Sequence, residues 1–169
     1  MKSAIQLREI SFAQILPVWS QRLWPGRKSE IEPASIIDHT GRLSLDLRAL
    51  NPIFFWGAFD SGDTSGGPLG VISGFPTSGQ HFRCRGLWVD PLMRDLGIGS
   101  SLVQKSEEAA QSLNRSVLWT MPRLSALPFY LKYGFKEQKW VSDFEFGPHA
   151  LVEKTLSLTL EESVNQTRP

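Results

Sequence analysis

A strand, a tight turn and a helix are predicted in direct succession by the stretch RCRGLWVDPLMRDLGIGSSL, residues 83–102. The strand must stop at Asp90-Pro91, because proline has no N–H group to donate to a sheet. Gly97 and Gly99 then allow the backbone N–H groups at the helix start to come close to a ligand. Since the positive end of the helix dipole lies there, the stretch predicts an anion site suited to a phosphate or pyrophosphate.

The helix after the turn is amphipathic, and its polar positions, including Glu107 and Glu108, are predicted to face water. Its apolar stripe consists of Ile98, Leu102, Ala109 and Leu113, widened by Val103 and Ala110.

The strand before the turn changes phase along its length. Phe82 and Cys84 share one parity, whereas Leu87 and Val89 share the other. A strand with one buried face can do this only through a bulge, and a bulge costs least at Gly86. A strand that is buried on both faces is the alternative.

Other elements are predicted on either side of this unit. Ser11 is expected to cap a helix to about Leu23, which Pro17 should kink or delay, and a second helix covers 125–133 and ends at Gly134. Residues 28–52 predict a short helix or a loop. Alternating or continuously apolar segments predict strands at 5–10, 54–59, 69–75, 116–121, 135–140 and 149–156. The glycine-rich segment 60–67 predicts a hairpin loop.

Composition places the chain among ordinary globular proteins. It has 169 residues, of which 41% are hydrophobic and 21% charged, and its net charge is +1. We therefore expect one domain over 1–160 with a frayed tail at 161–169, and neither nucleic acid nor membrane as a partner. The lone Cys84 excludes an internal disulfide, and the N-terminal residues lack the apolar core of a signal peptide. Both observations favour a cytoplasmic location.

Two motifs carry a resemblance to a known family. RDLGIG, residues 94–99, matches the R/Q-x-x-G-x-G/A pattern of the GNAT superfamily of N-acetyltransferases, and PFYLKYGF, residues 128–135, resembles the F-Y-x-x-x-G-F pattern near the end of that domain. A Rossmann fingerprint is excluded because Leu102 occupies the position of its third small residue, and no Gly-Lys-Ser/Thr follows as in a Walker loop. The order of elements resembles the family from about Ile5 to Leu156.

The resemblance implies an α/β (α+β) GNAT-like fold. Its central mixed, mostly antiparallel sheet would splay at the bulged strand and carry helices on both faces. Acetyl-coenzyme A would be the co-substrate, no metal would be needed, and the acyl group could be acetyl or longer. The implied cofactor-binding residues are Leu87, Trp88 and Val89, whose backbone meets the pantetheine amides, and Arg94, Asp95, Leu96, Gly97, Ile98, Gly99 and Ser100 around the pyrophosphate. The Arg94 side chain either adds a charge there or lies on the surface.

By the same resemblance, Tyr130 would protonate the departing thiolate. A phenol with a pKa near 10 suits a thiol with a pKa of about 8–9, although a core tyrosine is the alternative. A neutral amine would attack the thioester directly. No covalent intermediate is expected, because Cys84 has neither a histidine nor an acid beside it in sequence, and it is better explained as a packing thiol. No residue stands out as the base. Asp90 caps the next turn equally well, and His39, His81 and His149 lack metal-ligand spacing.

The acceptor pocket of this fold would be built here by Trp19, Trp24, Arg27 and Arg123. Arg123 stands where many family members have asparagine. Further candidates are Arg22, Arg42 and residues 144–146. Aromatic walls with several arginines suit a small-molecule amine that also carries a carboxylate or phosphate, unless these arginines are ordinary surface charges. Four alternatives stay open: a protein or peptide amine as acceptor, a non-catalytic acyl-coenzyme A-binding module, another phosphate-bearing ligand, and a homodimer, since dimers are common in the family.

Overall fold

All strands belong to one sheet in the computed structural model, which describes residues 4–35, 51–141 and 145–158. Within these residues the sheet has seven strands in the order β1-β2-β3-β4-β5-β7-β6. The strands are β1 (Ile5–Glu9), β2 (Phe54–Asp60), β3 (Gly70–Pro76), β4 (His81–Val89), β5 (Val117–Thr120), β6 (Lys136–Val141) and β7 (His149–Thr155). Each lies within about two residues of the predicted strand. The β4–β5 pair is parallel and the other pairs are antiparallel, which confirms the predicted fold class.

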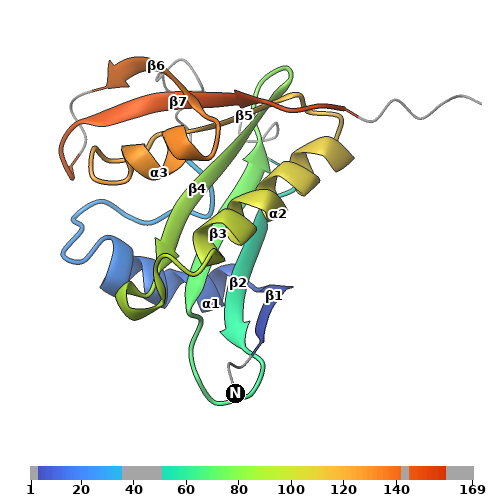
Figure 1. The fold of residues 1–169 in the computed structure, drawn as a ribbon. Helices are drawn as coiled ribbons and strands as arrows, with labels where there is room; N and C mark the ends of the chain where they lie inside the picture. The colour runs from blue at the N-terminus through green and yellow to red at the C-terminus, as the bar shows by residue number, and fades with distance from the viewer. Residues whose placement is uncertain (1–3, 36–50, 142–144, 159–169) are drawn as a thin grey trace, which may run out of the picture.

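Helices cover both faces of this sheet (Figure 1). Helices α2 (Ile98–Ser112) and α3 (Leu127–Lys132) pack on one face, where the main core forms around Phe82, Leu102 and Leu118. Helix α1 (Phe12–Val18) packs on the other face around Ile15 and Val71. The buried apolar residues of α2 follow the predicted stripe, and Ser106 is buried beside them. None of the helices described is long and apolar enough to cross a membrane.

The first helix starts where the sequence predicts. The Ser11 hydroxyl accepts from the Gln14 N–H at 3.2 Å, and the Gln14 side chain accepts from the Ser11 N–H at 2.8 Å, which completes a capping box. Pro17 does not delay the start. Instead the helix continues into a π-helical segment, η1 (Trp19–Leu23), which closes with the Trp24 N–H on the Trp19 carbonyl at 2.7 Å.

The predicted bulge lies at Gly86. Val71 pairs with Trp88 and Ser73 with Arg85, so two residues of β4 face one residue of β3. Gly86 has φ +70°, a conformation that glycine adopts without steric cost. Since the bulge flips the alternation, Phe82, Cys84, Leu87 and Val89 all join the α2 face. The alternative of two buried faces also holds in part, because Arg83 and Arg85 are buried on the opposite face.

Strands β4 and β5 separate soon after they meet. They pair at His81, Phe82 and Arg83 only, and β5 ends at Thr120. The backbone of β4 from the bulge to Val89 therefore has no strand on its β5 side among the residues described. This opening is the splay that the family resemblance implied.

The C-terminal part of the chain closes the sheet beyond β5. Helix α3 begins two residues later than predicted, and Pro128 lies in its first turn. Gly134, with φ +104°, ends it, with the Phe135 N–H on the Tyr130 carbonyl and the Gly134 N–H on the Leu131 carbonyl, a Schellman cap. Strand β7 lies between β5 and β6. Residues 28–35 form neither helix nor strand. The predicted apolar runs within 36–50 and the tail 161–169 lie outside the described residues.

Candidate functional site

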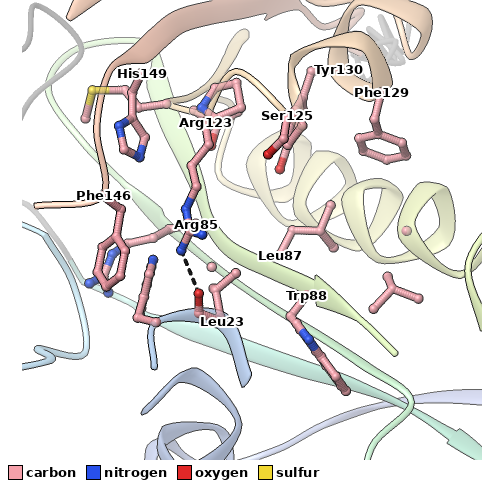
Figure 2. A pocket seen from close by; sticks show the side chains of 18 of the residues that line it. Leu23, Arg85, Leu87, Trp88, Arg123, Ser125, Phe129, Tyr130, Phe146 and His149 are labelled. Carbon is pink, nitrogen blue, oxygen red and sulfur yellow. Dashed lines mark hydrogen bonds between the residues drawn. The ribbon is translucent and has the colours of Figure 1, made fainter. Parts of the chain in front are cut away.

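A cavity of about 1170 Å³ occupies the opening between β4 and β5 (Figure 2). The N-terminus of α2 borders one end, and α3 borders the middle with Phe129 and Tyr130. The other end is bordered by segments that are far apart in the sequence, including Trp24, Arg123 and Phe146. We call the first the donor end and the second the acceptor end.

The donor end is built from backbone. Gly97 precedes α2 with φ +82°, and a side chain added there would meet nothing within 4 Å. The first bond of the helix runs from the Ser101 N–H to the Gly97 carbonyl at 3.0 Å, so the N–H groups of residues 98–100 have no partner within the helix. The first turn carries no acidic residue. The arrangement therefore suits an anion at the positive end of the helix dipole.

Most of the predicted cofactor-binding residues border this end. Leu87, Trp88, Val89, Arg94, Asp95, Gly97, Ile98, Gly99 and Ser100 all line the cavity. Leu96 does not line it and is 59% exposed. A side chain at Gly99 would come within 3.3 Å of the Phe129 ring, so the missing side chain lets α2 approach α3.

Two polar side chains of the turn have local partners. Arg94 is exposed, and its Nε donates to the Val89 carbonyl at 3.2 Å, so the guanidinium folds over the rim of the cavity. The Asp90 carboxylate accepts from the Leu92 N–H at 2.9 Å and caps the short helix η3 (Pro91–Met93). Asp90 therefore has the capping role that the sequence left open.

Tyr130 lies in the middle of the cavity wall and is 5% exposed. Phe129 and Phe135 hold its ring edge to face at centroid distances of 5.1 and 5.3 Å. Burial raises the pKa of the phenol well above 10, and nearby Cys84 adds to the rise, while a hydrogen bond with Thr120 opposes it. The hydroxyl is thus firmly protonated at neutral pH, more so than the reference value of a phenol implies.

Cys84 and Glu107 lie behind this wall. Cys84 is fully buried and does not line the cavity, and burial raises the pKa of its thiol to about 12. It is a packing thiol, as expected. Glu107 differs from the expectation of a solvated residue, because its carboxylate lies 2.5 Å from Lys154 Nζ and its side chain is only 16% exposed. Lys154 comes from β7, which the helix pattern alone does not reveal. Glu108 is exposed, as predicted.

The acceptor end contains three of the four predicted acceptor residues, Trp24, Arg27 and Arg123. Arg123 Nη2 donates to the Leu23 carbonyl at 2.6 Å, a bond drawn in Figure 2, and its guanidinium lies 4.8 Å from the Phe146 ring centroid. Arg27 lies over the Trp24 ring at 4.8 Å and donates to Ser29 Oγ at 2.8 Å. These residues join the end of η1 to the segments after β5 and before β7.

The structure corrects the predicted position of Trp19. The sequence placed it in the acceptor wall, but it is fully buried beneath β4 and does not line the cavity. Its indole Nε1 donates to the Gly86 carbonyl at 2.8 Å, so Trp19 holds the bulge in place. A hydrogen bond across 67 positions cannot be inferred from local pattern. Arg22 lines the cavity as an exposed residue, whereas Arg42, His39 and Phe144 lie outside the described residues.

Among the cavity residues that sequence reasoning did not assign to a site are Arg83, Arg85 and His149. Arg83 and Arg85 are each 7% exposed, and both line the cavity. The sequence feature that could have identified Arg83 and Arg85 is the presence of two arginines at alternate positions of an otherwise apolar strand. Such a pair is unusual in a strand with neighbours on both sides.

His149 lies at the start of β7, where its Nδ1 is 2.8 Å from the Gly147 carbonyl. Burial, followed by Arg123 and Arg83, lowers the pKa of His149, although the bond to Gly147 opposes this. The imidazole is therefore neutral at pH 7. Across the described parts of the chain, no group of three His, Cys, Asp or Glu could hold a metal ion. His81 instead lies 3.6 Å from Glu153.

Comparisons with known proteins agree with this geometry. The family model described as acetyltransferase (GNAT) family matches residues 17–135. Among solved structures, Ard1 from Thermoplasma volcanium has a TM-score of 0.66 at 20% identity, covering 91% of this chain and 99% of that one. An acetyltransferase of the GNAT family from Staphylococcus aureus Mu50 has a TM-score of 0.64 at 17% identity, covering 91% and 100%. A ribosomal-protein alanine N-acetyltransferase from Escherichia coli has a TM-score of 0.62 at 12% identity, covering 94% and 98%. At these identities the structural likeness supports the fold alone. No curated protein matches the sequence.

Proposed function

The chain belongs to the acetyltransferase (GNAT) family, and on that premise we propose that it transfers an acetyl group to a primary amine of a small molecule by direct attack. Membership makes it an N-acetyltransferase that uses acetyl-coenzyme A. The small-molecule acceptor, the direct attack and the residue roles given below are the proposal.

The observation that carries it is the continuity of the cavity. One space joins the N-terminus of α2, the buried Tyr130 hydroxyl and the aromatic and cationic residues of the acceptor end. A phosphate-bearing donor and an amine acceptor could therefore enter from opposite ends and meet beside Tyr130. Bringing two reactants together in this way supplies a large part of the rate of a group transfer.

The residues at the donor end fit coenzyme A. The open space at Gly97 and the N–H groups of residues 98–100 would hold the pyrophosphate. Backbone of Leu87 to Val89, which has no strand on its β5 side, would hydrogen-bond the pantetheine amides as a neighbouring strand does. The bound donor supplies the acetyl group as a reactive thioester.

Tyr130 would act on the leaving sulfur. Because burial raises its pKa, the hydroxyl holds its proton over the physiological range and donates a hydrogen bond to the charge that develops as the C–S bond breaks. The same rise makes it a weaker acid than a free phenol. Its contribution is therefore charge stabilisation first and proton delivery second.

The attacking amine must be neutral. Arg123 and Arg83 already lower the pKa of His149 in the same cavity, and an amine that lies between these arginines and Tyr130 would experience a cationic field of the same sign. A nearby positive charge favours the neutral form of a base. The acceptor end thus helps to present the amine in its reactive form.

Tyr130→Phe tests the proposal, because the Phe129 and Phe135 contacts survive the loss of the hydroxyl. In an amine-panel assay that follows thiol release from acetyl-coenzyme A, we expect kcat to fall about 100-fold with unchanged affinity for coenzyme A. Tyr133→Phe is the matched control. Tyr133 also lines the cavity, but its ring contact with Lys154 Nζ at 4.2 Å does not need the hydroxyl, so turnover should hardly change.

Two results would count against the proposal. Full turnover of Tyr130→Phe would remove the role assigned to Tyr130. Binding of acetyl-coenzyme A without thiol release for any small amine in the panel would favour a binding module. A peptide with a free N-terminal alanine belongs in the panel, and turnover confined to it would favour a protein acceptor.

A further inference from the structure

The guanidinium of Arg85 is buried in the wall of the acceptor end. The residue is 7% exposed and lines the cavity. Trp19 and Trp24 contact the guanidinium at centroid distances of 5.0 and 5.1 Å, and its Nη1 donates to the Glu32 carbonyl at 2.8 Å. A guanidinium has five N–H donors in a planar fork, so one backbone bond and two ring contacts leave most of this fork unused.

The charges near Arg85 are mostly of its own sign. Arg83 and Arg27 lie close enough to lower its pKa further after burial, and Glu32 alone opposes them. Glu32 is exposed and offers its main-chain carbonyl at hydrogen-bond distance. Two carboxylates line the cavity, Asp95 at the donor end and Glu145 at the acceptor end, and Glu145 accepts from the Lys28 N–H and from Ser29 Oγ. Among the described residues, no ion pair includes Arg85.

A buried cation without a carboxylate partner is costly to maintain. A structural contact to one carbonyl does not require a charge, since a neutral donor would make the same bond. The cost is offset if a ligand supplies the missing negative charge. Arg123 lines the same end and likewise donates to a carbonyl, that of Leu23, but it is only half-buried, so the cost is smaller there.

The anionic groups of the donor cannot supply this charge while they occupy the donor end. Arg85 precedes Val89 by four residues of β4, which corresponds to about 13 Å along the strand. The N-terminus of α2 follows Val89 across a turn, on the far side of the bulge. Figure 2 likewise shows Arg85, Arg123, Phe146 and His149 gathered on one side and Tyr130 and Phe129 on the other.

We propose that Arg85, supported by Arg123, binds an acidic group on the acceptor, so that the substrate class is a small amine bearing a carboxylate or a phosphate. The inference rests on the proposed function and narrows it. Both groups present oxygen atoms that a guanidinium fork can bind in pairs. Trp24 and Phe146 would pack against the carbon skeleton between the amine and the acidic group. The amine would then point along the cavity toward Tyr130.

Matched pairs of amines test this inference by binding alone. Amino carboxylates of graded chain length are compared with their amides, and aminoalkyl phosphates with the corresponding amino alcohols. Each is titrated calorimetrically into the protein saturated with coenzyme A. We expect at least one acidic member to bind about tenfold more tightly than its neutral partner. We call this difference in affinity within a pair the gap. The two series separate carboxylate from phosphate recognition.

Arg85→Gln should abolish this gap, and Arg85→Lys, which keeps the charge but loses the fork, should retain part of it. Arg8→Gln is the charge-matched control, since Arg8 lies on the edge strand β1, contacts the Phe59 ring and does not line the cavity. A purely structural Arg85 would weaken both members of a pair equally, because loosening of the Glu32 segment affects every acceptor. The gap is therefore the decisive quantity.

The inference is overturned if no acidic member binds more tightly than its neutral partner, or if the gap survives in Arg85→Gln. Should Arg85→Gln fail to fold, Arg123→Gln and the wild-type gap still decide the question. The proposed function can fail separately. If acidic amines bind with the gap intact but no thiol is released from acetyl-coenzyme A, the proposed function fails while the inference about Arg85 stands.

Discussion

The donor end and the acceptor end of the cavity are built in different ways. The donor end is made by backbone within one continuous stretch, from the bulge at Gly86 to the first turn of α2. The acceptor end is made by side chains such as Trp24, Arg85 and Phe146, which come from separate segments. A ligand held by backbone N–H groups is recognised by shape and charge and tolerates changes of side chain. A ligand held by converging side chains is sensitive to every one of them.

This contrast implies that the two ends of the cavity can be altered separately. Replacement of Arg85 or Phe146 alters the chemistry at one end without touching the turn that precedes α2. Replacement of Gly97 does the reverse. Gly86 lies between the two ends, and its carbonyl is held by Trp19 at 2.8 Å from the opposite face. Gly86, Gly97 and the side chains of the acceptor end therefore test the contrast independently.

Gly86→Ala should have the largest effect of the variants, because Gly86 lies between the two ends of the cavity. A methyl group there would lie 2.4 Å from the Trp19 ring, on a residue with φ +70°. The clash and the left-handed backbone together should lower the free energy of unfolding by about 3 kcal/mol, measured by denaturant titration. Gly26→Ala is the control, with φ +74° and no atom within 4 Å. Equal losses for the two variants would show that the Trp19 contact does not hold the bulge.

Gly97→Glu should disable the donor end alone. The site has room for a side chain, so the fold should persist, but the new carboxylate would lie at the proposed phosphate site. Affinity for coenzyme A should fall about 100-fold or more, measured by calorimetry.

Gly79→Glu matches this change elsewhere, with φ +62° and nothing within 4 Å, away from the cavity lining. It should leave the affinity unchanged. Near-normal binding by Gly97→Glu would place the phosphates elsewhere.

The smallest effect concerns the charge at the acceptor end. In the folded protein burial, Arg123 and Arg83 lower the pKa of His149, so its NMR titration should fall below the ordinary value of 6.5. Arg123→Gln removes one repelling charge and should move this pKa upward. Because the folded state then disfavours the proton less, stability should also decline less as the pH falls through 6.5. A downward or absent movement would show that Arg123 does not set the field there.

Much of the donor end could be predicted from the sequence. The phase change in β4 located the bulge, and the two glycines after the strand located the turn, because alternation and glycine conformation are local properties. For the acceptor end, only some of the residues were predicted. Trp24, Arg27 and Arg123 do line the cavity, but Trp19 does not, and Arg85 and His149 were missed. Which face of a strand meets a cavity depends on how its neighbours diverge, and that is not a local property.

The sequence by itself determined the order of the elements and the turn at Gly97, since these follow from short-range periodicity and backbone preference, and its two motifs carried the resemblance to the family. The tertiary structure alone decided the rest. It buried Arg85 against Trp19 and Trp24 and raised the pKa of Tyr130 by burial. It also placed Trp19 outside the predicted acceptor wall, where its indole binds the Gly86 carbonyl of the bulge. Burial, and with it the cost of a charge and the strength of an acid, is fixed only when distant segments pack together.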